Sequence, residues 1–171
     1  MRLTCVVVAL AACMALPMAA QESRFDDPFL GQLTGHWVMR GTIAGAETTD
    51  DVDVEWVLGH NYLRIHDLSR GKLPEGGPRY EAMVFIGWDP VRKQYDCLWL
   101  DITGSGGLTG EGMGHGKRVG DEIPFLFKLP DGSMIHNTFV YEREKDAWHW
   151  RIDNETDGKL TPFARVTLTR T

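Results

Sequence analysis

The chain has 171 residues, a length typical of one domain, and a formal net charge of -6, from 18 lysine and arginine against 24 aspartate and glutamate residues. The basic residues are scattered along the sequence rather than gathered into a stripe. Nucleic acids and anionic membrane surfaces bind to concentrated positive patches, so neither is expected as a partner.

Residues 1–20 have the pattern of a secretory signal peptide. Arg2 supplies the positive start, and an apolar run from Leu3 to Leu16 is rich in small residues. This run is too short for a comfortable transmembrane span. We therefore predict cleavage before Gln21 and a periplasmic or secreted domain over residues 21–171.

A second interpretation of the N-terminus stays open. Residues 10–13 (LAAC) resemble the bacterial lipobox, in which the cysteine becomes the lipidated first residue. Cys13 would then anchor the protein to a membrane.

After cleavage at Gln21, Cys97 is the one remaining cysteine, so no internal disulfide is expected. Cys97 alternates with Tyr95 and Trp99, which predicts a buried side chain rather than a nucleophile.

The mature chain begins with a short helical turn and then changes to strands. Asp27 is placed to cap the turn, and Pro28 suits its first position. Gly35 precedes Trp37 by two residues, and we expect this glycine to let the backbone pass close under the indole.

From Trp37 onward the hydrophobic pattern has a period of two. The stretch 50–58 alternates most clearly, with valines 52 and 54 opposite Asp51 and Asp53. Short stretches of this kind, separated by turns, predict about ten strands in an all-β antiparallel barrel or sandwich. The predicted strands start at Trp37 and continue over residues 50–58, 62–69, 79–88, 95–102, 123–129, 134–143, 147–153 and 162–170.

The last predicted strand is expected to close on the first. Arg170 shares a face with Val166 and Leu168, which places it at a barrel end. There its guanidinium would stack on Trp37, for about 0.5–2 kcal/mol. We therefore interpret Trp37 as part of the barrel closure and not of a ligand site.

The glycine-rich stretch 104–116 lacks the features of a phosphate-binding loop, since no Lys-Ser/Thr pair and no helix pattern follow. Gly110, Gly112, Gly114 and Gly116 have the same parity. A strand that is bare on one side lets another element approach closely or leaves space in a cavity.

Residues 35–37 (GHW) near the start and 167–170 (TLTR) at the end resemble the calycin pattern of lipocalins and fatty-acid-binding proteins. Residues 56–63 (WVLGHNYL) and 87–95 (GWDPVRKQY) resemble the bacterial domain-of-unknown-function family number 1579. The resemblance runs from Pro28 to Arg170. It implies a single lipocalin-like barrel of about ten strands and no established activity.

The chain is also similar to the haem-binding nitrobindin barrels, which share a Gly-x-Trp start but usually have a glycine where this chain has Met39. That resemblance implies an axial histidine from a late strand. His136 is the better candidate, because His149 lies opposite Trp148 and Trp150 and should face water. A single strand histidine is more often structural, so no cofactor is expected, and haem stays an alternative.

No motif indicates a catalytic or metal centre. The histidines lack metal-binding spacing, and no serine lies in a Gly-x-Ser-x-Gly elbow. Barrels of this size can enclose one ligand, so we predict an exported barrel that binds a small, largely apolar molecule. The candidate ligand-binding residues are Arg64, His66, Tyr80, Trp99 and His136.

Two alternatives stay open. The barrel could hold no ligand and act as an interaction or assembly module, with Leu98 and Leu100 forming an apolar outer patch for a homodimer contact. It could instead be a small-molecule enzyme that uses the same lumen. A lumen filled by tryptophan and phenylalanine would contradict ligand binding, and a lumen without titratable groups would argue against an enzyme.

Overall fold

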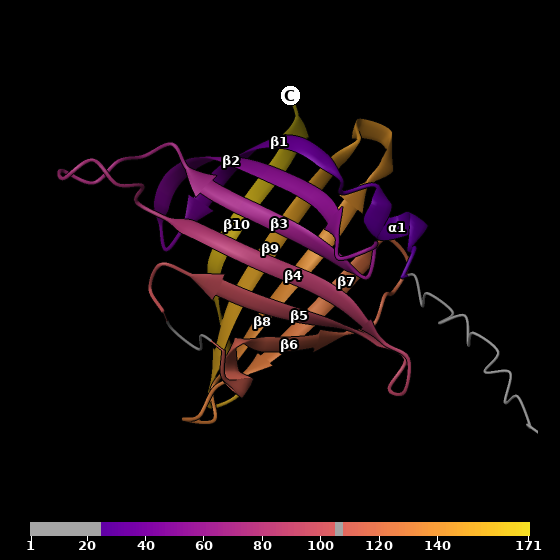
Figure 1. Cartoon of the computed structure of the whole chain (residues 1–171). Helices are drawn as coiled ribbons and strands as arrows, with labels where there is room; N and C mark the ends of the chain where they lie inside the picture. The colour runs from indigo at the N-terminus through magenta and orange to yellow at the C-terminus, as the bar shows by residue number, and fades with distance from the viewer. Residues whose placement is uncertain (1–24, 105–107) are drawn as a thin grey trace, which may run out of the picture.

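A computed structural model describes residues 25–104 and 108–171, without the side chain of Glu111. Ten antiparallel strands form a closed barrel in which each strand pairs with its neighbours in sequence and the last pairs with the first (Figure 1). The predicted all-β, ten-stranded barrel is therefore confirmed. The strands are β1 (Gly35–Ile43), β2 (Ala46–Val57), β3 (Tyr62–Ser69), β4 (Glu81–Asp89), β5 (Gln94–Asp101), β6 (Met113–Gly116), β7 (Glu122–Lys128), β8 (Met134–Glu142), β9 (Ala147–Thr156) and β10 (Lys159–Arg170).

The proposed signal peptide and Cys13 lie outside the described residues. Within the described ranges, no helix is long and apolar enough to span a membrane. Cys97 is buried and its thiol is free. Burial raises the pKa of this thiol, which matches its interpretation as a core residue.

The helix α1 (Pro28–Gly31) covers one end of the barrel (Figure 1). Asp27 caps it as predicted, with Oδ1 accepting hydrogen bonds from the backbone N–H groups of Phe29 at 2.7 Å and Leu30 at 3.2 Å. Phe29, Leu30 and Leu33 are buried in the core. Residues 28–34, which come just before β1, therefore close this end of the barrel, and we call them the stopper.

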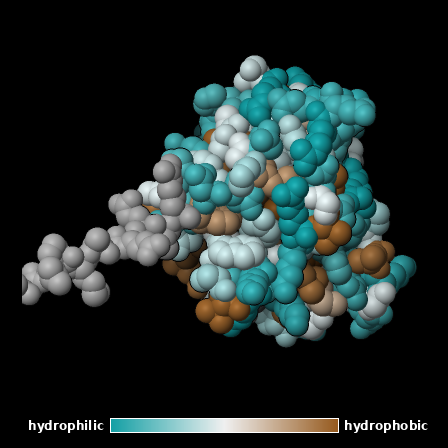
Figure 2. All heavy atoms as spheres, turned by 90° about the vertical axis from the view of Figure 1, so that its right-hand side faces the viewer, coloured by the Kyte–Doolittle hydropathy of each residue, from teal (hydrophilic) through white to brown (hydrophobic). Residues whose placement is uncertain are grey.

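Aromatic side chains extend this closed end. The ring of Phe25 packs against Trp56 at 5.6 Å and Trp88 at 6.1 Å between centroids. The hydroxyl of Tyr95 donates to Asp27 Oδ2 at 2.5 Å. Figure 2 looks at this end and shows a mostly hydrophilic surface with separate hydrophobic side chains. The apolar groups of the stopper are thus turned mainly toward the barrel.

Arg170 fastens the stopper to the closed sheet. Its guanidinium carbon lies 4.1 Å from the centroid of the Trp37 ring, and the two residues are paired across β1 and β10. Nη1 and Nη2 donate to the carbonyls of Thr34 and Gln32, each at 2.9 Å. The Trp37 Nε1–H donates to the Leu33 carbonyl at 2.7 Å. The predicted stacking is confirmed, and hydrogen bonds to the chain after α1 are added to it.

Gly35 serves this arrangement differently from our expectation. Its φ is +122°, and a Cβ built there would lie 2.8 Å from Nη1 of Arg170. The missing side chain therefore makes room for the guanidinium as well as allowing a backbone conformation that is strained for other residues.

The glycine-rich stretch is only partly a strand. Gly110–Gly112 forms a short 3-10 helix, and β6 begins at Met113. At Gly114 a Cβ would lie 2.5 Å from the Phe127 ring of the neighbouring strand. The close-approach interpretation is confirmed at Gly114, where the phenyl ring occupies the space of a side chain.

We expect Trp37→Ala to lower the free energy of unfolding by about 3–5 kcal/mol, the cost of truncating a fully buried aromatic residue. Urea unfolding followed by far-ultraviolet circular dichroism would measure it. Trp88→Ala, which truncates a partly exposed tryptophan at the same end, should cost less. Equal losses for the two variants would contradict the closure role.

Candidate ligand-binding cavity

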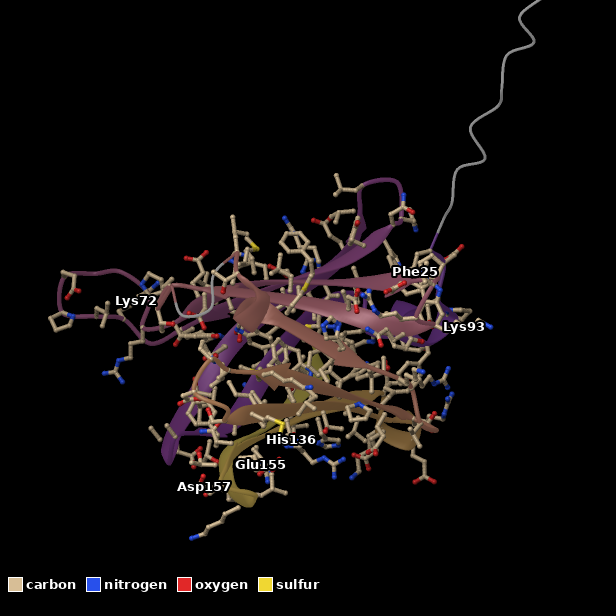
Figure 3. All side chains as sticks on the ribbon, turned by 90° about the horizontal axis from the view of Figure 1, so that it is seen from below. Phe25, Lys72, Lys93, His136, Glu155 and Asp157 are labelled. Carbon is tan, nitrogen blue, oxygen red and sulfur yellow. The ribbon has the colours of Figure 1, made fainter. Side chains whose placement is uncertain are left out.

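The barrel is filled at the α1 end and hollow toward the other end. A cavity of about 770 Å³ lies between the core aromatics and the loops that join β3 to β4 and β7 to β8. Figure 3 places Phe25 and Lys93 at the closed end and Lys72, in the β3–β4 loop, at the opposite end. A lumen completely filled by tryptophan and phenylalanine is therefore ruled out.

Most of the cavity wall is apolar. Met39, Phe127, Trp150 and Val166 project inward from four different strands. The indole of Trp150 stacks on Phe139 at 5.0 Å between centroids, which fixes it on the barrel wall. Such walls with a few polar groups are typical of small-molecule sites.

Two carboxylates interrupt this wall on adjacent strands. Asp50 in β2 has the same parity as Val52 and Val54, and Asp67 in β3 has the same parity as Leu63 and Ile65. All of these side chains are buried in the barrel. The alternation that directs the valines and leucine inward therefore directs the two acids inward as well.

The Asp50 and Asp67 side chains form a buried acidic pair. Asp50 is 0% and Asp67 2% exposed. The Thr48 hydroxyl donates to Asp50 Oδ1 at 2.5 Å. In the described part of the chain, Asp50 Oδ2 and Asp67 Oδ1 have no hydrogen-bond donor. Burial, the charge of Asp50 and a hydrogen bond to it raise the pKa of Asp67 to about 8. The pair therefore holds one proton at neutral pH.

Tyr80 and Trp99, both predicted as ligand-binding residues, do line the cavity. The Trp99 Nε1–H donates to the Tyr80 hydroxyl at 3.0 Å, and that hydroxyl donates to Asp101 Oδ2 at 3.2 Å. Burial, followed by the charges of Asp101 and Asp67, raises the pKa of Tyr80. Tyr80 therefore stays neutral and acts as a hydrogen-bonding residue near the mouth.

Two further polar atoms face the lumen from β8 and β9. Asn137 is 2% exposed, and its Oδ1 has no donor among the described residues; Trp150 Nε1 likewise has no acceptor there. Both residues line the cavity. Leaving buried polar groups without partners costs about 1–3 kcal/mol each, so a bound molecule that supplies those partners would be favoured.

Arg64, His66 and His136, the other predicted ligand-binding residues, lie on the outer face of the barrel. They pair with Glu55 at 2.5 Å, Glu81 at 2.8 Å and Glu155 at 2.6 Å. Figure 3 shows His136 beside Glu155. The reason is parity, because the buried residues of β3 are the odd-numbered ones from Leu63 on, and the buried residues of β8 are likewise odd-numbered from Asn137 on. The even-numbered residues of both strands point outward.

The described lining of the cavity lacks the axial histidine that the nitrobindin resemblance implies. All six histidines belong to the described part of the chain, and none lines the cavity. His136 holds Glu155, and His149 pairs with Glu142 at 2.9 Å. The described residues also contain no group of three or more His, Cys, Asp or Glu side chains placed to hold a metal ion.

The prediction missed Asp50, Asp67 and Asn137. A signal for the two acids was present in the sequence, because each has the parity of the apolar residues of its strand. An aspartate with inward parity is costly to bury. Two such aspartates on neighbouring strands indicate a polar site inside the barrel. Asn137 shares its parity with Phe139 and could have been found in the same way.

Comparison of the chain with protein-family models gave no match. Comparison with curated proteins also found no matching sequence.

The acidic pair makes stability depend on pH in a defined direction. An unfolded Asp67 loses its proton near pH 4, whereas the folded one keeps it to about pH 8. Stability from this group is therefore present at low pH and is lost as pH rises through this window. The wild type should therefore lose unfolding free energy between pH 5 and pH 8, whereas Asp67→Asn has no such titration. We expect the difference in unfolding free energy between the variant and the wild type to change by on the order of 3 kcal/mol, in favour of the variant, over this range.

Urea unfolding at pH 5, 6.5 and 8 would measure this difference. Asp53→Asn is the matched control, since it removes a carboxylate from the outer face of the same sheet. If the wild type and Asp67→Asn followed parallel pH curves, the shared proton would be refuted.

Proposed function

We propose that this protein is an exported, calycin-like barrel that binds a small, largely apolar molecule in its lumen. The observation that carries the proposal is the cavity of about 770 Å³, which lies within the size range of small-molecule sites. Export rests on the signal-peptide pattern of residues 1–20, and kinship with the calycins rests on the short motifs and their order.

The geometry supports binding from within the barrel. One end is stopped by α1, so a ligand would enter between the loops of the other end. Ala164 and Val166 of β10 keep that side of the lumen wide because their side chains are small, while Trp150 on β9 offers an aromatic surface. Apolar area removed from water would supply about 25 cal/mol per Å² toward binding.

An enzyme using the same cavity is a second candidate. Asp50, Asp67, Tyr80 and Asp101 bring titratable groups together in a partly apolar space, and a carboxyl that keeps its proton near neutral pH is suited to general acid catalysis. Recovery of an unchanged ligand from the purified protein would favour binding, whereas conversion of that ligand would favour the enzyme.

A contact on the outer face is a third candidate. Met83 is paired with Leu100, and Phe85 and Met113 are both paired with Leu98. These residues are partly exposed and have the parity of the outer face, so they form a continuous apolar patch. Analytical ultracentrifugation of the wild type and of Leu98→Glu would detect a homodimer that depends on this patch.

We expect the purified protein to bind the uncharged dye N-phenyl-1-naphthylamine with a rise in dye fluorescence. Ala164→Phe should weaken binding at least tenfold, because the added ring enters the cavity. Native mass spectrometry of the protein from its own source would look for a co-purifying molecule.

Thr169→Phe is the matched control, since it places the same ring on the outside of β10. Both variants should keep the wild-type circular dichroism spectrum. Equal dye binding by the wild type and Ala164→Phe would contradict lumen binding.

A further inference from the structure

The cavity has a strongly unequal distribution of charge. Carboxylates line it at Glu47, Asp50, Asp67 and Asp101. Arg79 is the single basic residue among the described residues of its lining, and it is exposed and donates from Nε to the Lys72 carbonyl at 3.2 Å. In a low-dielectric lumen such an arrangement attracts cations and repels anions.

The unsatisfied side-chain atoms of the charged wall are acceptors. Asp50 Oδ2 and Asp67 Oδ1 have no donor in the described part of the chain, although both residues are almost fully buried. One proton held by the pair removes one of the two negative charges but leaves these two oxygens without a donor. A ligand ammonium group would supply N–H donors to both oxygens and a positive charge between the two carboxylates.

From these contacts we propose that the lumen selects molecules carrying a protonated amine on an aromatic body, with the ammonium group bound between Asp50 and Asp67. The inference rests on the proposed binding function and names its ligand class. It uses the acids that line the cavity, whereas Asp51 and Asp53 on the outer face already have Arg70 and His36 as partners.

The aromatic part of the ligand follows from the opposite wall. The Trp99 and Trp150 rings lie 6.3 Å apart at 77°, and both border the cavity. Two indoles at this angle offer a face and an edge to a third ring. An aromatic amine can therefore bury its ring against Trp150 and Trp99 while its ammonium group reaches the acids of β2 and β3.

Exchange of the proton on the acidic pair for an ammonium ion leaves the net charge of the site unchanged. One ammonium ion enters, and one proton leaves Asp67 for the solvent. The groups that face this site are Glu47 from β2, Asp101 from β5, and Arg79 and Tyr80 from the β3–β4 loop. Their charges favour the cation on balance. Affinity for the amine should therefore rise by up to tenfold per pH unit from pH 6 and level off near pH 8.

Isothermal titration calorimetry with three matched probes tests the inference: 1-naphthylmethylamine, 1-naphthalenemethanol and 1-naphthoate. We expect the amine to bind wild-type protein at least tenfold more tightly than the alcohol, and the carboxylate to bind most weakly. Titrations at pH 6.5 in two buffers of different ionisation enthalpy should show close to one proton released per amine bound, and none for the alcohol.

Three variants separate the contributions. Asp50→Asn/Asp67→Asn keeps the shape of the site without charge and should bind amine and alcohol equally. Asp67→Asn retains Asp50, so it should still prefer the amine but release no proton. Asp53→Asn, on the outer face, should behave as the wild type. Circular dichroism confirms folding, and Asp67→Asn decides the matter if the double variant does not fold.

Three results would overturn the inference. If the alcohol and the uncharged dye bind as tightly as the amine, the lumen binds ligands without selecting a cation, and the proposed function stands alone. An equal loss of amine preference in Asp53→Asn would show general surface attraction instead. If neither the dye nor any of the probes binds, the proposed binding function fails together with this inference.

Discussion

Closure of β1 on β10 is the constraint on which the remaining structure depends. A ten-stranded sheet that does not close would leave two unpaired edges, and such edges invite association with other chains. Here Trp37 and Arg170 are opposite each other across the joint. The same arginine holds the carbonyls of Gln32 and Thr34. A single side chain from the last strand thus fixes both the joint and the stopper.

The stopper and the cavity are two consequences of one closed barrel. At the α1 end the buried rings of Phe29, Tyr141 and Trp148 pack against one another, and the lumen is filled. Toward the other end the inward positions include small or polar residues such as Thr48, Ser69 and Ala164. The packed core therefore supplies stability at the α1 end, and the cavity lies toward the other end.

Acidic side chains have basic partners on the outer face of these strands and none among the described residues of the inner face. Outside, acids alternate with cations across strands, as in Asp51 with Arg70 and Glu55 with Arg64. Exposed pairs of this kind contribute about 0–1 kcal/mol each. Inside, Asp50 and Asp67 face each other without a basic partner, and a shared proton lowers the cost of burying them. This arrangement costs stability in the empty protein, and a ligand that supplies donors to the two acids would lower that cost.

The sequence by itself determined the class of fold, the turn capped by Asp27 and the burial of Cys97, because period-two alternation and capping act over a few residues. The contact of Arg170 with Trp37 followed from the expectation that the last strand closes on the first. Of the predicted ligand-binding residues, Tyr80 and Trp99 line the cavity. Arg64, His66 and His136 were chosen for their chemistry, and they lie outside because the buried residues of β3 and β8 have the opposite parity. Only the tertiary structure decided that the lumen holds a cavity and that Asp50 and Asp67 meet. Both depend on which strands become neighbours and on how the side chains of ten strands share one interior.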